Sequence, residues 1–468
     1  MDLFDGLNNK QIDAVKSLDE KNRIVAGAGS GKTKVLSHRF AYLVEKIGIH
    51  PSNILCITFT NKAAQEMKKR IGTLIPLHNV NDFICTFHGL CVKILRREIH
   101  RIGYPANFQI MDTDDGASIA KHVMEELGLD RKNEKVSKFL DGVRGYKYNS
   151  PYIRDVILPG TKVKQEDMTK EIRYVQYQQK SFSLDFDDLV HFALYILTNF
   201  KDAREYWTNQ FNYVMVDETQ DCNRKDWELL EIMYERHGNV FIVGDPDQAI
   251  YEWRGARPKL FVGFKSDKDV ILNQNYRSTP NILKVANSVI SHNNMRIKKD
   301  LVTTTNKDKA PVYHHTWTED GEGAYIADQI ELLTKEKKNY DDIAILYRAS
   351  YMSRFVEQAL MKKKLPYTVW GGIRFFERKE IKDALGYLRM IEYKDDLSFQ
   401  RIINYPSRKF GEASLKKLRA IADEENCTLF EAMKAHKRGK AFNKKQLLDF
   451  IPQIRSESVC SNQFNCYA

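Results

Sequence analysis

The residues best suited to chemistry lie in a glycine-rich stretch near the start of the chain, AGAGSGKT (26–33). Its three glycines allow the backbone to turn tightly, so that N–H groups can close around phosphate oxygens. Lys32 can reach the β- and γ-phosphates of a nucleotide, and the Thr33 hydroxyl can bind Mg²⁺. A glycine-rich turn before a helix is the plainer alternative, but the Lys-Thr pair favours a phosphate-binding loop. The residues expected to contact the nucleotide here are Ala26, Gly27, Ala28, Gly29, Ser30, Gly31, Lys32 and Thr33.

Two adjacent acids in VMVDETQD (214–221) suit the same chemistry. Asp217 ends an apolar run, where its carboxylate can hold Mg²⁺, and Glu218 can orient or deprotonate an attacking water. Neighbouring acids at a strand end are often only a solvated loop. Together with the glycine loop, however, they predict ATP hydrolysis, with ATP and Mg²⁺ as cofactors.

The stretch VGDPDQAIYEWRGA (243–256) combines two kinds of chemistry. Gln248 follows an apolar strand, where its amide can sense a γ-phosphate or the attacking water. Tyr251 and Trp253 can present ring faces to unpaired bases, and base–aromatic stacking contributes roughly 1–3 kcal/mol per base. The alternative is that both aromatics are core residues. The adjoining glycine, arginines and acids favour stacking over core packing, so that one segment would touch both a nucleotide and a nucleic acid.

Strands and helices alternate around these residues and must position them. Near-continuous apolar strands separated by helices predict an α/β fold whose parallel sheet is covered on both faces. The strand-like segments are 23–25, 53–59, 82–87, 213–217, 239–245 and 270–275. Charged helical patterns replace strands between about 106 and 190, which predicts a helical insertion. A second α/β section begins near 310, with expected strands at 311–317, 342–348 and 367–372.

The composition suits a protein that meets a polyanion. The 468 residues carry a formal net charge of +11, and 29% are charged against 43% hydrophobic. Such a balance fits nucleic-acid binding, although many unrelated proteins share it. Seven scattered cysteines without metal-ligand spacing suit a reducing cytoplasm. We find no secretion signal and no apolar run long enough for a membrane span, so we expect a cytoplasmic protein.

The ordered motifs closely resemble those of the UvrD/Rep/PcrA-type superfamily 1 DNA helicases. The matching stretches are LNNKQIDAV, AGAGSGKTKVLSHR, ITFTNKAAQEMKKRI, TFHGL, VDETQD, VGDPDQAIYEWRGA and QNYRSTPNIL. The resemblance implies a RecA-like P-loop lobe, stepping in the 3′→5′ direction, and single-stranded DNA and single-strand/duplex junctions as partners. It also implies that Gln11 reads the adenine edge, that Arg39 lies near the base and that Tyr276 stacks on the adenine.

The resemblance makes Arg277 a finger that reaches the γ-phosphate across a cleft, a role worth about 10³–10⁵ in kcat. Isolated from its motif, it would read as a surface salt bridge. Strand ends and the aromatic segment supply the expected DNA contacts. These are Phe59, Thr60, Asn61, Thr86, Phe87, His88, Tyr251, Trp253 and Arg254. A lone histidine such as His88 is more often structural. Candidate backbone contacts to the duplex are Arg408, Lys409 and Gly411.

The expected domain organisation follows the family with one departure. The expected domains are 1–105 and 191–275 (first RecA-like lobe), 106–190 (helical insertion), 276–380 (incomplete second RecA-like lobe) and 381–468 (start of a second helical subdomain). We find no counterpart of the family's last two motifs. This leaves three readings open: a helicase of this family, shortened or interrupted; an ATP-responsive single-stranded-DNA-binding module without unwinding, or one completed by a second polypeptide; and another P-loop enzyme such as a nucleotide kinase.

Overall fold

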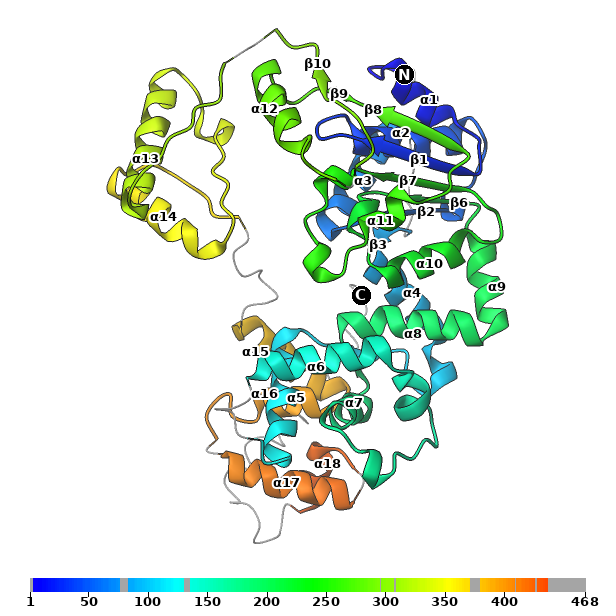
Figure 1. Ribbon diagram of the computed structural model, residues 1–468. Coiled ribbons are helices and arrows are strands. Elements are labelled where there is room, and N and C mark those ends of the chain that lie inside the picture. Colours follow the sequence, from blue (N-terminus) through cyan, green and yellow to red (C-terminus); the bar gives the residue numbers. More distant parts are fainter. Residues whose placement is uncertain are drawn as a thin grey trace. The chain divides into compact units, whose positions relative to one another are not determined.

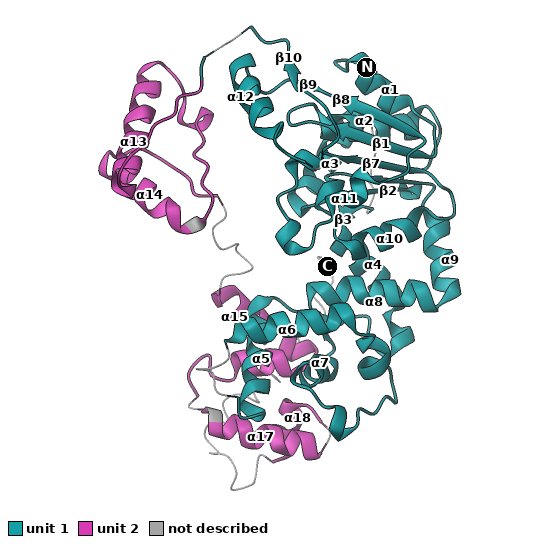
Figure 2. Cartoon of the chain, in the orientation of Figure 1, with its two compact units in different colours: residues 1–310 teal, residues 311–468 magenta. Residues whose placement is uncertain are grey.

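The chain forms two compact units, residues 1–310 and 311–468 (Figure 2). The computed structural model describes residues 3–75, 83–129, 135–294, 296–306, 309–370, 379–408, 410–425 and 427–436. The first unit contains the sheet and every residue expected to contact nucleotide.

A six-stranded sheet forms the centre of the first unit (Figure 1), with the strand order β3-β2-β6-β7-β1-β8. All its strand pairs are parallel, so their carboxyl ends meet at one edge. The strands are β1 (Lys21–Ala26), β2 (Ile54–Thr58), β3 (Ile84–Thr86), β6 (Tyr213–Val216), β7 (Val240–Gly244) and β8 (Lys268–Leu272). Every residue of β2 and β7 is buried, because helices cover both faces.

Alternate residues of each strand feed two separate hydrophobic clusters. In β2, Ile54 and Cys56 belong to one cluster, whereas Leu55 and Ile57 belong to the other. This follows from the two-residue period of a strand. The first cluster lies under α1 (Asn9–Lys16), α2 (Lys32–Glu45) and α3 (Asn61–Leu74), and the second under α4 (Phe87–Glu98) and α10 (Arg224–Tyr234). The predicted parallel α/β fold is thus confirmed.

The segment between β3 and β6 is helical, as the sequence predicts, with one exception. Two short strands, β4 (Gln109–Ile110) and β5 (Ser183–Leu184), pair in parallel where no strand was expected. Two-residue strands leave too short an apolar run to recognise in a sequence. The helices of this insertion are α5 (Thr113–Glu126), α6 (Val136–Asn149), α7 (Lys170–Lys180), α8 (Phe186–Asn199) and α9 (Lys201–Gln210).

A buried ion pair ties the insertion together. Lys147 Nζ lies 2.6 Å from Asp185 and 2.7 Å from Asp188, and the Tyr152 hydroxyl donates to Asp188. Burial and the negative charge of Asp185 raise the pKa of Asp188 to about 7. The lysine therefore compensates acids that would otherwise be costly to bury.

The first unit ends in a segment that returns to the sheet edge. It comprises α11 (Pro258–Val262), β9 (Gln274–Asn275), α12 (Pro280–Ile290) and β10 (Val302–Thr303). The pair β9–β10 is parallel, with Val302 opposite Gln274. This pairing brings residues near 300 back to the strand end that follows β8.

Two small helical cores form within the second unit. In the first, α13 (Glu319–Lys335) and α14 (Ser353–Lys362) pack around Ala327, Ile330 and Leu360. In the second, a cluster that includes Phe399 and Phe430 lies among four helices. These are α15 (Lys379–Glu392), α16 (Asp396–Ile402), α17 (Glu412–Glu424) and α18 (Leu429–Ala435).

The strands expected in the second unit do not form. Among the described residues, 311–317, 342–348 and 367–370 pair with no other strand, while 371–372 lie outside the described part. Trp317 and Leu346 are each 94% exposed. A strand needs a neighbouring strand to accept and donate its backbone hydrogen bonds. Without one, these segments form no sheet, and apolar side chains such as Trp317 and Leu346 stay exposed.

The cysteines and the apolar character of the helices both bear on expectations from composition. The five cysteines among the described residues are free thiols: Cys56, Cys85, Cys91, Cys222 and Cys427. No helix in the described ranges combines the length and the apolar character that crossing a membrane requires.

Candidate functional site

The glycine-rich loop joins β1 to α2 at the carboxyl edge of the sheet. Gly29 and Gly31 have φ of +67° and +85°, a region that glycine adopts without the strain of a Cβ atom. Gly31 is also the N-cap of α2, and no side chain caps that helix. The first-turn N–H groups of α2 are therefore suited to bind an anion.

Neighbouring amides hold this loop from two directions. Gln11 Nε2 donates to the Ser30 carbonyl over 2.9 Å, and Asn275 Nδ2 donates to the Ala28 carbonyl over 2.7 Å. The Tyr276 N–H donates to the Gly29 carbonyl over 3.0 Å. The loop carbonyls are thus engaged by protein groups. The N–H groups of Gly27 and Ser30 also donate within the protein, to the carbonyls of Leu272 and Gly27, so those of Gly29 and residues 31–33 are the ones suited to a ligand.

The lysine of the loop meets the acids that follow β6. Lys32 Nζ lies 2.6 Å from Glu218 Oε2, and the same oxygen accepts from Gln220 Nε2 over 2.9 Å. Glu218 has φ of +50°, unusual for a residue with a side chain. Such strain is often found at functional sites. A nucleotide's phosphates would compete with Glu218 for the lysine.

The Asp217 carboxylate is suited to a divalent cation. It is buried, and its Oδ1 accepts from the Glu218 N–H over 3.0 Å. Burial, with the charge of Glu218, raises its pKa to about 7, while Lys32 acts in the opposite direction. A bound cation would favour the charged form. Thr33 stands in the first turn of α2 at the same sheet edge, so a hydroxyl and a carboxylate can contribute the oxygen ligands that Mg²⁺ prefers.

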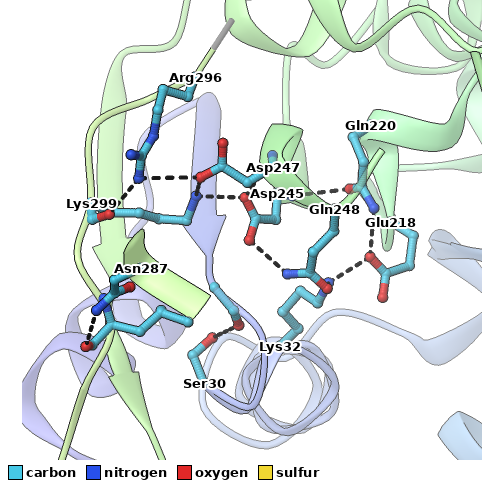
Figure 3. A network of polar contacts seen from close by, with 12 residues as sticks. Ser30, Lys32, Glu218, Gln220, Asp245, Asp247, Gln248, Asn287, Arg296 and Lys299 are labelled. Carbon is cyan, nitrogen blue, oxygen red and sulfur yellow. Dashed lines mark hydrogen bonds and ion pairs between the residues drawn. The ribbon is translucent and has the colours of Figure 1, made fainter. Parts of the chain in front are cut away.

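Gln248 lies in a polar network at the end of β7 (Figure 3). Its Nε2 donates to Asp245 Oδ2 over 2.6 Å, and its Oε1 accepts from Lys32 Nζ over 3.4 Å. The Asp245 N–H in turn donates to Gln220 Oε1 over 3.0 Å. Since Gln220 also binds Glu218, these five residues form a closed circuit through four side-chain contacts and the Asp245 N–H. We call it the polar ring (Lys32, Glu218, Gln220, Asp245 and Gln248).

The sequence reasoning missed two cations here: Lys299, which contacts the ring at Asp245, and Arg296, which contacts the neighbouring Asp247. Lys299 Nζ lies 2.5 Å from Asp245 and 2.7 Å from Asp247, and Arg296 Nη2 lies 3.5 Å from Asp247. Both follow α12, about fifty residues beyond the acids. The signal in the sequence is the acid pair of GDPDQ, which needs a cation once buried, but spacing cannot say which cation.

Exposed aromatics lie next to the polar ring. Phe59 and Tyr251 stack with ring centroids 5.1 Å apart, and Arg254 lies over both Tyr251 and Trp253. Trp253 is 70% exposed, which rules out the alternative of a core residue. We call these four residues the aromatic patch (Phe59, Tyr251, Trp253 and Arg254).

Arg39, which was predicted to lie near the base, is a buried residue that binds backbone carbonyls. It is 1% exposed, and its Nη1 donates to the carbonyls of Ala14, Val15 and Ser17 at the end of α1. Its guanidinium also stacks over Phe241 at 4.3 Å. Carbonyls at a helix end lack intrahelical partners, so a buried arginine satisfies several of them together.

Arg408 and Phe87, both predicted to contact DNA, are also buried. Arg408 is buried, and its Nη1 donates to backbone carbonyls, including those of Ile402 and Ile403, so it is not a free phosphate contact. Phe87 packs in the hydrophobic core under α4. Of the neighbours proposed for duplex contact, Gly411 is exposed and Lys409 lies outside the described residues.

The polar residues expected to contact DNA divide into caps and exposed groups. Thr60 Oγ1 accepts from the Ala63 N–H and caps α3, and Thr86 Oγ1 caps α4 in the same way. Asn61 is exposed at the start of α3, and exposed His88 packs edge-on against Phe186. DNA contact by these residues stays a prediction.

The residues predicted for the base and the γ-phosphate lie beside the loop. Tyr276 is exposed, and its hydroxyl accepts from Asn8 Nδ2 over 2.7 Å. A Cβ atom on Gly29 would lie 2.9 Å from that of Arg277. Gln11 is buried, with its Oε1 accepting from the Asn8 N–H. The second N–H of its amide nitrogen and the second lone pair of its amide oxygen are left for a base.

Comparisons with known proteins agree with this geometry. Residues 7–269 match the UvrD/REP helicase N-terminal domain, and residues 270–445 match the UvrD-like helicase C-terminal domain. The chain belongs to the UvrD/REP helicase family. It is 39% identical, over 437 residues, to the ATP-dependent DNA helicase PcrA of Staphylococcus epidermidis, and 38% identical to that of Staphylococcus aureus. Each match covers 92% of this chain and 60% of the relative, so the chain spans about three fifths of these relatives' length.

Proposed function

We propose that this chain hydrolyses ATP and uses the energy to move 3′→5′ along single-stranded DNA and to unwind duplex DNA ahead of it. The observation that carries the proposal is the continuity between the polar ring and the aromatic patch. Gln248 ends the 3₁₀ turn η6 (Pro246–Gln248), and the next turn, η7 (Glu252–Arg254), contains Trp253. Four residues separate Gln248, which contacts Lys32, from Trp253, whose ring is placed to stack on a base.

ATP binding would use the loop and its lysine. The N–H groups of Gly29 and residues 31–33 would surround the phosphates, and Lys32 would leave Glu218 for the β- and γ-oxygens. Mg²⁺, held by Thr33 and Asp217 with the phosphates, would neutralise charge that develops during transfer. Arg277 would contribute a further positive charge from beside Gly29.

Hydrolysis would use the acid that the lysine releases. Once Lys32 contacts phosphate, the Glu218 carboxylate is free to accept a proton from an attacking water. Gln248 would orient that water or the γ-phosphate, because its amide already points toward Lys32. Any shift of Gln248 on hydrolysis would be transmitted through η6 and η7 to the stacking rings, which is the proposed coupling.

The test measures ATP hydrolysis and unwinding by the purified chain. ATP turnover should rise when a single-stranded oligonucleotide is added, and a duplex with a 3′ tail should be unwound faster than one with a 5′ tail. The alternative, an ATP-responsive binding module without unwinding, draws no support from the comparisons. Turnover stimulated by DNA, without strand separation on either substrate, would favour it. No turnover with or without DNA would refute the proposed activity altogether.

The proposed surroundings follow from the same chemistry. We infer single-stranded DNA and single-strand/duplex junctions as partners, because stacking rings and backbone contacts tolerate any sequence. Free thiols suit a reducing compartment, and we infer the cytoplasm.

A further inference from the structure

A lysine far from the nucleotide loop in sequence lies buried beside it (Figure 3). The Lys299 side chain is 2% exposed, and its Nζ bridges Asp245 Oδ1 at 2.5 Å and Asp247 Oδ2 at 2.7 Å. Arg296 Nη2 donates to the Lys299 carbonyl over 2.7 Å. The lysine is therefore fixed at both its backbone and its ammonium group.

The acid pair depends on this cation. Asp245 and Asp247 are two residues apart and both nearly buried, and Asp247 Oδ1 has no hydrogen-bond partner in the described part of the chain. Two nearby carboxylates disfavour each other's charged form unless a cation lies between them. Without Lys299, Asp245 would lose its cation, and Asp247 would keep only the longer contact with Arg296 at 3.5 Å.

The acid pair in turn fixes the orientation of Gln248. Asp245 Oδ2 accepts from Gln248 Nε2 over 2.6 Å, which directs the amide oxygen toward Lys32. The Asp245 N–H also donates to Gln220, which binds Glu218. Lys299 thus stabilises the polar ring through Asp245, whereas Lys32 contacts the other acid of the ring, Glu218.

The segment that carries Lys299 is fastened to the glycine loop. Asn287 makes two hydrogen bonds with Leu301, donating to its carbonyl over 3.0 Å and accepting from its N–H over 3.1 Å. A Cβ atom on Gly27 would lie 2.2 Å from Leu301 Cδ2, so the leucine packs directly on the loop backbone. The backbone that carries Lys299 is therefore held in place partly by the packing of Leu301 on the glycine loop.

We propose that Lys299 is a positioning residue for ATP hydrolysis, which holds Gln248 in its working orientation through Asp245 and Asp247. The inference rests on the proposed function, because a turnover step must exist for Gln248 to serve. It predicts a loss in kcat with little change in the apparent affinity for ATP. Lys299 itself contacts neither the glycine loop's N–H groups nor Lys32, so nucleotide binding should survive its removal.

The test compares Lys299→Met with Lys298→Met, a matched control at the exposed neighbouring lysine. DNA-stimulated kcat should fall on the order of 10- to 100-fold in Lys299→Met, because misplacing a positioned group by about 1 Å can cost that much. KM for ATP should stay within about twofold, since loss of an interaction made only in the transition state lowers kcat alone. Lys298→Met should match the unaltered chain. Lys299→Arg, which keeps the charge, should recover part of the lost turnover.

A second readout is independent of activity. Hydrogen exchange, followed by mass spectrometry, should quicken in the peptide 243–256 of Lys299→Met and stay unchanged in peptides from α8. If the unaltered chain shows no turnover, the proposed function fails, while this exchange still decides whether Lys299 holds the Gln248 segment. Unchanged exchange there, or a kcat equal to that of Lys298→Met, would overturn the proposal.

Loss of the lysine also destabilises the protein, because Asp245 is then buried without a cation and Asp247 keeps only Arg296. The double variant Lys299→Met/Asp247→Asn removes one negative charge together with the cation and should restore the thermal midpoint. It should not restore kcat, because nothing then fixes Asp245 against Gln248. Full recovery of turnover in the double variant would show that Lys299 serves stability alone and would contradict a positioning role.

Discussion

At the scale of single residues, Lys32 is the group on which nucleotide chemistry depends. Its 2.6 Å contact with Glu218 places it where a phosphate would exchange with the acid. Lys32→Ala should lower ATP turnover by at least about 10²-fold, because charge in the transition state loses a preorganised cation. Single-stranded DNA binding should change little. Lys46→Ala, at the other end of the same helix, is the control; unaltered turnover in Lys32→Ala would refute the assigned site.

Trp253 is the residue through which we expect DNA to affect hydrolysis. Trp253→Ala should weaken single-stranded DNA binding by about 1–3 kcal/mol and remove most of the DNA stimulation of ATP turnover. Basal turnover without DNA should persist, because the polar ring is untouched. Trp253→Phe should retain part of the effect, and Trp317→Ala removes an indole outside the aromatic patch that is more exposed still, at 94% against 70%. A Trp253→Ala chain that DNA stimulates fully would contradict stacking at this position.

At the scale of elements, the N-terminal cap of α10 contains a buried acid that lowers the free energy of unfolding as the pH rises. Asp226 Oδ2 accepts from the Asn223 N–H, yet burial raises its pKa to about 6 from the ordinary 3.8. A raised pKa in the folded state means that the folded protein binds a proton more tightly than the unfolded chain. Stability from this group is therefore highest below pH 4 and is lost as pH rises through 6.

Asp226→Asn should remove that cost while keeping an oxygen for the cap. The free energy of unfolding should rise by about 1–2 kcal/mol at pH 8, and the gain should shrink toward pH 4. Urea unfolding of the variant and the unaltered chain at both pH values measures the difference. Glu231→Gln, an exposed acid on the same helix, should show no such trend. Destabilisation by Asp226→Asn at pH 8 would mean that the carboxylate's hydrogen bond outweighs its burial.

At the scale of the whole molecule, residues 1–310 form one of the two compact units and contain the complete candidate nucleotide site. Both large hydrophobic clusters lie inside this range. We expect a fragment of residues 1–310 to unfold cooperatively, because a domain with its own hydrophobic core can fold alone. We also expect the fragment to bind ATP within about threefold of the full chain's affinity, because it contains the candidate site. Calorimetric titration and thermal unfolding of the fragment measure both. A fragment that is unfolded, or that binds no nucleotide while the full chain does, would place an essential contact beyond residue 310.

The helical pairs of the second unit illustrate what a sequence pattern predicts well and badly. The repeating apolar residues of α13 predict a helix, and one forms, because its hydrogen bonds are made within the element. The segment 342–348 has the apolar character of a strand, but a strand forms only where a neighbour pairs with it. Local pattern therefore sufficed for the helix and not for the strand.

The sequence by itself determined the glycine loop, the acids after β6, the aromatic segment and the parallel sheet that carries them. These features are local: each depends on a short run of residues and on the period of one element. The tertiary structure alone decided that Lys299 holds Asp245 and Asp247, and that Arg39 and Arg408 serve backbone carbonyls. Which charge meets which partner is set when distant segments pack, because burial forces each charge to find compensation among whatever neighbours the fold brings within reach.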